Sequence, residues 1–365
     1  MSFRSHFDPS SLLELCTVPR IGSARIRNLI TRFGSPGGVL SASPRELAQV
    51  DGIDKKVALN IKRGGNKQFV SEQLQLLKQA GGSLVSLWDD YYPPLLKKIY
   101  DPPILLFVRG NLKSLCSNCF SIVGTRYPSS YGKINAEKFA RELAQQSFTI
   151  ISGLARGVDT AVHRAVVSSG EQTVAILGSG IDTIYPYENN KLAEQITERG
   201  ALVSEFPMGT KPDAPHFPRR NRIISGICMG TLVIEAGEKS GALITADFAL
   251  EQGREVFAMP GSVNNPKALG TNRLIQQGAK LTIDVKDILE ELHVQIKETQ
   301  FSKKPNIPLS EVENKVLNFL STQPEHIDNI ATQCSMPTSE VLGVLLTLEL
   351  KNVVKQLVGK NFVRI

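Results

Sequence analysis

Three arginines and an aromatic ring lie close together in residues 216–222. This combination suits single-stranded nucleic acid, because the cations neutralise phosphates while an exposed ring stacks on an unstacked base. The alternative is a capped helix whose polar side chains hold structure, with Arg222 paired to Glu205 or Glu235. For Arg222 both interpretations stay open. The expected DNA-binding residues of this stretch are Phe217, Arg219, Arg220, Asn221 and Arg222.

A loop rich in glycine and serine follows an apolar segment that ends at Val123. A strand, such a loop and a helix cradle an anion, since unpaired amides and the positive helix end face the same ligand. The dinucleotide fingerprint G-x-G-x-x-G is absent, and Ile134 stands where a P-loop needs Ser or Thr. A phosphate site remains, with an arginine that can bind a phosphate in bidentate fashion or stack on a base. Its expected residues are Gly124, Thr125, Arg126, Ser129 and Lys133.

Similar glycine-containing loops follow several later apolar segments. Each loop alone could be a plain turn, but several at one edge of one sheet favour a row of phosphate-binding loops. The expected residues of this row are Gly153, Arg156, Gly178, Gly180, Ser240 and Gly241.

The elements that must position these loops alternate between apolar strands and helical stretches over residues 118–293. Strands that are apolar throughout indicate an α/β fold, in which a parallel sheet is covered on both faces and binds ligands at the carboxyl ends of its strands. The predicted strands are Phe120–Gly124, Phe148–Gly153, Thr173–Gly178, Ala201–Glu205, Thr231–Glu235, Glu255–Met259 and Lys280–Ile283. The predicted helices include Lys133–Gln146, Asp159–Ser169, Asn189–Arg199, Leu243–Gln252 and Asn272–Gly278.

Residues 1–80 are predicted to form a small helical domain with two helix-hairpin-helix-like units, at Leu15–Ile30 and Leu47–Ile61. In each unit a glycine turns the chain, and the next helix, starting at Ala24 or Ala58, presents its amides to a phosphate. The region carries 12 Lys and Arg against 6 Asp and Glu, and this net charge of +6 favours a polyanionic partner. The alternative is a helical interaction domain whose glycines only cap helices.

The C-terminal region is predicted to be a winged helix, with three helices at Ser310–Leu320, Ile327–Gln333 and Thr338–Lys351 and a hairpin from Val353–Val358 to Phe362–Ile365. Residues 305–365 have a net charge of −1, and the first three turns of the third helix lack Lys and Arg. We therefore expect poor binding to duplex DNA, and any leftover apolar surface would suit a protein partner.

The predicted domain order is a helical domain (1–80), a sheet domain (81–296), a linker (297–309) and the winged helix (310–365). Four prolines in residues 81–110 predict extended chain packed on the following sheet. Five cysteines imply no disulfide framework, and neither a metal site nor a cofactor is expected. Because no signal peptide or run of 18 apolar residues occurs, we expect a cytoplasmic protein with no membrane partner.

From about Tyr91 to Ala279 the chain resembles the DprA (Smf) family of DNA-processing proteins. The resemblance rests on Tyr92-Pro93, Gly124-Thr125-Arg126, Ser152-Gly153-Leu154-Ala155 with Gly157 and Asp159, Tyr185-Pro186, Ser204-Glu205, Phe217-Pro218 with Arg220-Asn221-Arg222, Ser240-Gly241, Pro260-Gly261 and Gly270-Thr271-Asn272.

This resemblance implies an extended Rossmann-like core and a homodimer that binds single-stranded DNA in a basic pocket. It also implies that the protein protects incoming DNA and loads the RecA recombinase during natural transformation. The family's pocket arginine and aromatic correspond to Arg126 and Phe217. Some relatives carry a lysine three residues before the aromatic, where this chain has Ala214; the nearest lysine is Lys211, which we include among the expected DNA-binding residues.

The competing function is a nucleotide-processing enzyme on the same scaffold, similar to a phosphoribohydrolase. Its candidate acids are Asp159, Asp182, Glu205 and Glu235. Asp159 is better explained as a helix cap, and no Ser-His-Asp set has supporting spacing. A scaffold that binds only proteins leaves the arginine and phenylalanine cluster unexplained. The sequence therefore favours a DNA-binding protein that is not an enzyme.

Overall fold

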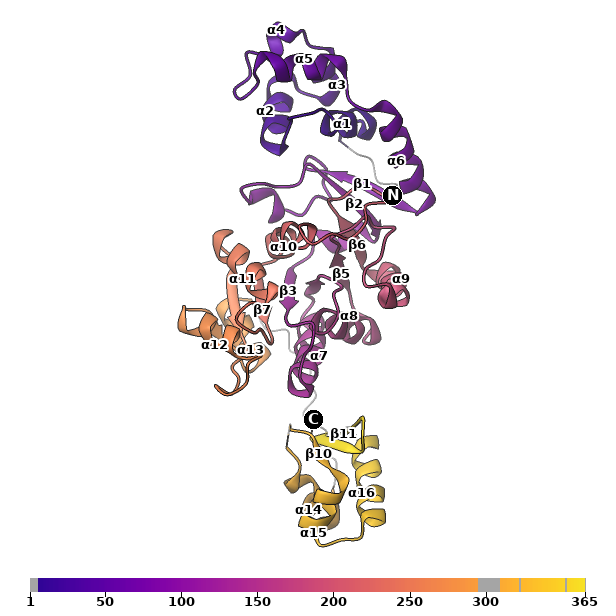
Figure 1. The fold of residues 1–365 in the computed structure, drawn as a ribbon, viewed down its shortest axis with the longest axis vertical. Coiled ribbons are helices and arrows are strands. Elements are labelled where there is room, and N and C mark those ends of the chain that lie inside the picture. The colour runs from indigo at the N-terminus through magenta and orange to yellow at the C-terminus, as the bar shows by residue number, and fades with distance from the viewer. Residues whose placement is uncertain (1–5, 295–308, 322, 352, 365) are drawn as a thin grey trace.

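The computed structural model describes residues 6–294, 309–321, 323–351 and 353–364. Helices open this described part of the chain, at the top of Figure 1. They are α1 (Pro9–Cys16), α2 (Ser23–Phe33), α3 (Pro36–Ser41), α4 (Pro44–Leu47), α5 (Lys55–Arg63) and α6 (Lys67–Gln79). Together α1 and α2, and then α4 and α5, form the two helical pairs that the sequence predicts.

The second helix of each pair begins earlier than the sequence pattern indicated. Helix α2 begins at Ser23, one residue before Ala24. Helix α5 begins at Lys55 rather than at Ala58, because the Asp54 carboxylate accepts a hydrogen bond from the Val57 amide at 2.7 Å. An aspartate that satisfies a free amide in this way defines the start of a helix.

The central sheet has the strand order β1-β2-β6-β5-β4-β3-β7-β8-β9 in the described residues. Its parallel part comprises β3 (Cys119–Val123), β4 (Thr149–Ser152), β5 (Thr173–Ile176), β6 (Ala201–Ser204), β7 (Gly230–Val233), β8 (Glu255–Ala258) and β9 (Lys280–Leu281). All seven correspond to predicted strands, and each ends one or two residues earlier than predicted.

Two further strands make the sheet mixed rather than purely parallel. β1 (Gly82–Ser86) pairs antiparallel with β2 (Leu105–Gly110), and β2 pairs antiparallel with β6. The predicted extended segment 81–110 is thus part of the sheet itself. Its four prolines lie between the two strands, where they remove no hydrogen bond from the ladder.

Helices cover both faces of the sheet, as predicted. One face packs against α7 (Ser130–Gln145), α8 (Val158–Ser168) and α13 (Val285–Glu291), which share one hydrophobic cluster with Phe120, Ile150 and Phe257. The other face packs against α10 (His216–Ile227) and α11 (Gly241–Glu251), in a cluster that continues into α1, α2 and α5. Therefore the N-terminal helices share a core with the sheet. The remaining helices of this region are α9 (Asn190–Arg199) and α12 (Leu269–Gln276).

The chain runs outward from β3 to β6 and then returns through α10 to β7, on the other side of β3. The strand order therefore reverses between β3 and β7. In open α/β sheets, ligands bind outside the carboxyl ends of the strands at such a switch point.

The C-terminal unit has its own hydrophobic cluster, which includes Val316, Leu345 and Phe362. It contains α14 (Glu311–Phe319), α15 (Ile327–Cys334), α16 (Thr338–Leu350) and a sheet of order β10-β12-β11 (β10, Glu325–His326; β11, Val354–Leu357; β12, Asn361–Arg364). The three helices and the hairpin agree with the predicted winged helix, whereas the two-residue β10 was not predicted. Apart from Leu309, the predicted linker 297–309 lies outside the described residues.

Candidate nucleic-acid interface

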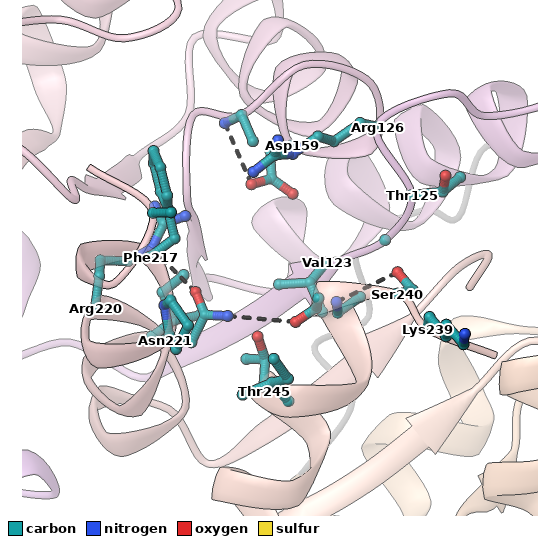
Figure 2. A pocket seen from close by; sticks show the side chains of 18 of the residues that line it. Val123, Thr125, Arg126, Asp159, Phe217, Arg220, Asn221, Lys239, Ser240 and Thr245 are labelled. Atoms are coloured by element: carbon teal, nitrogen blue, oxygen red, sulfur yellow. Dashed lines mark hydrogen bonds between the residues drawn. The ribbon is translucent and has the colours of Figure 1, made fainter. Parts of the chain in front are cut away.

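A cavity of about 870 Å³ opens at the switch point (Figure 2). Its walls are the loop after β3, the loop after β7 with the start of α11, and the first turns of α10. Eight predicted DNA-binding residues line it: Gly124, Thr125, Arg126, Phe217, Arg220, Asn221, Ser240 and Gly241. Thus the sheet brings together segments that lie more than 100 residues apart in the chain.

Arg126 and Phe217 form one wall of the cavity. The Cζ atom of Arg126 lies 5.6 Å from the centre of the Phe217 ring, within the range of a cation–π contact. The Tyr185 ring lies 5.9 Å from Phe217 on the same wall. A Cβ at Gly178 would come within 3.0 Å of the Phe217 ring, so this glycine makes room for the aromatic, and Gly178 itself does not line the cavity.

The predicted anion cradle at the start of α7 is already filled by a carboxylate. The backbone amide and hydroxyl of Ser129 donate to Glu235 at 2.8 and 2.5 Å, and the Thr125 amide donates to the Glu235 carbonyl at 2.7 Å. The prediction that these amides are free for a phosphate is therefore wrong. Ser129 and Glu235 line a separate cavity, and Lys133 is exposed on α7 but lines neither cavity.

Backbone amides of the loop after β4 are likewise bound by a carboxylate of the protein itself. The amides of Gly153 and Ala155 donate to the Asp159 carboxylate at 3.1 and 3.3 Å. Burial raises the pKa of Asp159, and the nearby Arg220 guanidinium opposes this rise. Asp159 therefore fixes the preceding loop by accepting hydrogen bonds from it, whereas the N-cap residue of α8 is Gly157. As a result, Gly153 has no free amide for a ligand.

Arg220 is only 5% exposed and connects the ends of two neighbouring strands at the floor of the cavity. Its Nη1 atom donates to the carbonyl of Gly153 at 2.6 Å and also to that of Ile176, at the ends of β4 and β5. Burial lowers its pKa to about 10, opposed by Asp159. A Cβ at Gly153 would overlap the Arg220 guanidinium, which is why a glycine is needed there.

The other two arginines of α10 are paired with one carboxylate. Arg222 donates to Glu205 at 2.6 Å and Arg219 donates to it at 3.1 Å. Of the two alternatives for Arg222, the structure supports the structural one, with Glu205 and not Glu235 as its partner. Neither arginine lines the cavity.

Gly180 and Lys211 also lie away from the cavity. The Gly180 amide donates to the Thr210 carbonyl at 2.9 Å, so it is not available to a phosphate. Lys211 is exposed in the loop before α10, and its side chain lines none of the cavity wall.

The start of α11 faces the cavity. The Ser240 hydroxyl caps the helix by accepting a hydrogen bond from the Ala242 backbone amide at 3.3 Å. The side-chain amide of Asn221 donates to the Gly241 carbonyl at 3.3 Å (Figure 2). No acidic residue lies in the first turn of α11. Lys239 is exposed beside Ser240 and lines the cavity, although it was not among the residues predicted to bind DNA. Its position next to Ser240-Gly241 was the available signal.

The described residues contain no cluster of three or more His, Cys, Asp or Glu side chains that could hold a metal. His163 is fully buried, its Nδ1 lies 2.7 Å from the Thr173 hydroxyl, and burial lowers its pKa to about 3. It is therefore neutral at ordinary pH and packs inside the fold. No helix in the described ranges is long and apolar enough to cross a bilayer.

Comparison with known proteins matches every part of this architecture. The family model for DNA recombination-mediator protein A matches residues 83–293. A helix-hairpin-helix tandem model matches residues 12–64, and the DprA winged-helix model matches residues 302–360.

Protein Smf of Escherichia coli is 40% identical over 291 residues, which cover 78% of each chain. DNA processing protein DprA of Bacillus subtilis is 44% identical over 220 residues, covering 60% of this chain and 74% of the relative. The crystal structure of DprA from Streptococcus pneumoniae superposes with a TM-score of 0.69 at 34% identity and covers 78% of this chain and 98% of that one.

DNA processing protein A from Helicobacter pylori, whose structure is described in terms of its single-stranded DNA binding mode, superposes with a TM-score of 0.53. It is 28% identical, and the match covers 58% of this chain and 95% of that one. With its family model, its domain order and its relatives in agreement, this chain belongs to the DprA/Smf family of DNA recombination mediators.

Proposed function

We propose that this protein binds single-stranded DNA in the cavity at the switch point, with little sequence preference and without catalysis. The observation that carries the proposal is the Arg126 guanidinium lying over the Phe217 ring in the cavity wall. A ring can stack only on a base that is released from a duplex, so this wall favours single strands. The single-strand binding described for the Helicobacter pylori relative supports the same conclusion.

The DNA contacts that we propose are fewer than the sequence indicated. Arg126 and Lys239 are exposed cations in the cavity wall, and no ion pair is recorded for either among the described residues. Phe217 supplies the stacking surface, and the positive N-terminal end of α11 at Gly241 attracts a phosphate. The Ser240 amide does not take part, because it donates to the Gly237 carbonyl at 3.0 Å.

Membership in the family supports the wider role. We infer that the protein protects incoming single-stranded DNA in the cytoplasm, acts as a homodimer and loads the RecA recombinase during natural transformation.

The test is fluorescence anisotropy of labelled oligo-dT and of a blunt duplex across a salt series. We expect preference for oligo-dT, with an affinity that falls as salt rises. Arg126→Ala should flatten the logarithmic salt slope by roughly 0.7, because one phosphate contact is lost. Phe217→Ala should weaken binding by about 1–3 kcal/mol with little change of slope, because stacking is lost.

Two exposed residues outside the cavity supply matched controls. Arg141→Ala on α7 and Tyr100→Ala before β2 each remove a side chain of the same kind from an exposed position. Both should bind oligo-dT like the wild type. Equal affinity for the duplex at physiological salt, or wild-type binding by folded Arg126→Ala and Phe217→Ala variants, would refute the proposal.

A nucleotide-processing enzyme is the second candidate, because the buried Asp159 lines the cavity with a raised pKa. Its carboxylate is engaged with two amides of its own loop, which favours a structural role. Release of free base from nucleoside monophosphates, lost in Asp159→Asn, would support the enzyme.

A further inference from the structure

Behind the wall formed by Arg126 and Phe217 lies a second, smaller cleft of about 40 Å³. Five residues line both the cavity and the cleft: Arg126, Tyr127, Ala155, Tyr185 and Phe217. The cleft is lined in addition by Gly153, Arg156 and Pro186. The two spaces therefore adjoin each other at these five residues, and a strand that leaves the cavity past Arg126 and Phe217 reaches the cleft next.

The cleft has two guanidinium groups and few other polar groups. Arg126 comes from the loop after β3 and Arg156 from the loop after β4. The amides of Gly153 and Ala155 are taken by Asp159, so the side chains rather than the backbone give the cleft its chemistry. Two guanidiniums at a cleft far smaller than the cavity suit a single anion such as a phosphate group.

Glu188 forms a bidentate ion pair with Arg156, the same arrangement that a phosphate would form with this guanidinium. Its two carboxylate oxygens accept from Nε and Nη2 of Arg156 at 2.6 and 3.0 Å. Both side chains are about half exposed, at 49% and 43%, so the pair is open to solvent and to competition. Pairing raises the pKa of Arg156 and lowers that of Glu188, so both stay charged near neutral pH. A phosphodiester offers the same fork of two oxygens to a guanidinium.

Aromatic surface adjoins these cations. The Tyr185 ring is 42% exposed, and Tyr127, which lines the same cleft, is 73% exposed. Because the Tyr185 and Phe217 rings lie 5.9 Å apart, successive bases of one strand can each stack on one of the two rings.

We propose that this cleft is a second subsite for the same DNA strand, in which a backbone phosphate displaces Glu188 from Arg156 while the adjoining base lies against Tyr185. When no strand is bound, the Glu188 carboxylate takes the place of the phosphate and keeps the Arg156 side chain in position. The inference rests on the proposed function, since it extends the strand outward from the cavity.

The test uses the full-length protein and an oligo-dT length series in anisotropy titrations. Glu188→Gln removes the competing charge, so it should tighten binding several-fold and steepen the salt slope by roughly 0.7. Arg156→Ala should weaken binding, only for oligonucleotides long enough to leave the cavity. In the double variant the gain from Glu188→Gln should vanish, because it depends on Arg156.

The Arg109–Glu194 pair is a matched control, since it is also bidentate but lies between β2 and α9 and lines neither space. Glu194→Gln changes the net charge by the same amount as Glu188→Gln and should leave binding unchanged.

A second measurement does not depend on affinity. Oligo-dT carrying 5-iodouracil should form a photocrosslink to Tyr185, and Tyr185→Leu should abolish it while the crosslink to Phe217 remains. Equal effects of Glu188→Gln and Glu194→Gln, together with the absence of a Tyr185 crosslink, would overturn the subsite. If Arg126→Ala and Phe217→Ala also bind normally, the proposed function fails as well; if they do not, only the subsite fails.

Discussion

Replacing Arg220 with methionine tests whether this arginine is a structural residue or a DNA contact. The guanidinium is buried and donates to the carbonyls of Gly153 and Ile176, and its charge opposes the effect of burial on the pKa of Asp159. Methionine fills much of the same volume but supplies no donor. Two carbonyls then lose a charged partner, and Asp159 loses its compensating charge.

The expected cost is large because a buried charge is left without its partner. Hydrogen bonds to charged groups contribute about 1.5–3 kcal/mol each, and breaking a buried charge pair typically costs about 3–5 kcal/mol. We therefore expect Arg220→Met to lower the free energy of unfolding by about 3–5 kcal/mol. Arg219→Met is the matched control, since its side chain is 58% exposed, and it should change stability by no more than about 0.5 kcal/mol.

The loss should also depend on pH. Without Arg220 the pKa of Asp159 rises further, so the folded state keeps a proton that the unfolded state releases above the ordinary value of 3.8. The folded state then binds more protons, and its stability falls as pH rises through that interval. Urea unfolding at pH 5 and pH 8 should show a larger deficit at pH 8.

The refuting result combines stability and binding. If Arg220→Met unfolds within about 1 kcal/mol of the wild type and its salt slope for oligo-dT is flatter by roughly 0.7, Arg220 neutralises a phosphate. In that case the structural assignment is wrong. A destabilised variant that binds more weakly with an unchanged slope supports it.

Three further outcomes follow from the same structure. Lys239→Ala should flatten the salt slope by roughly 0.7, measured by anisotropy, because it removes an exposed cavity cation. Since the pKa of His163 is lowered to about 3, the wild type should lose about 1.4 kcal/mol of stability per pH unit below 6.5 from this group, and His163→Gln should lose less in acid unfolding. Removing residues 305–365 should leave oligo-dT affinity nearly unchanged, because the winged helix has a separate core, and the isolated segment should not shift duplex DNA in a gel.

Most strands of the parallel sheet could be predicted because they are short apolar runs; β9 is the exception, with only Lys280 and Leu281, both exposed. β1 and β2 were missed as strands because the prolines between them dominate the segment's composition, and because β2 joins the sheet through β6, about 100 residues later. The two-residue β10 is too short to leave a periodic pattern.

The site itself was only partly predictable. The residue types of Arg126 and Phe217 were enough to select them as candidate DNA contacts, and the structure places them together in the cavity wall. A strand, a loop and a helix look the same in sequence whether the helix end is free or filled, so the role of Glu235 at Ser129 could not be seen. Likewise, neighbouring arginines on one helix give no sign that Arg220 is buried while Arg219 is exposed.

The carboxylates of Glu235 and Asp159 have a consequence for how fast and how tightly a strand binds. They satisfy the loop amides before any DNA arrives, so these loops do not have to order themselves around the ligand. The site is thus preorganised, and the entropy lost on binding belongs mostly to the DNA strand. Association should then be limited by diffusion and charge rather than by loop closure, with the observed rate rising linearly with oligonucleotide concentration and showing no plateau.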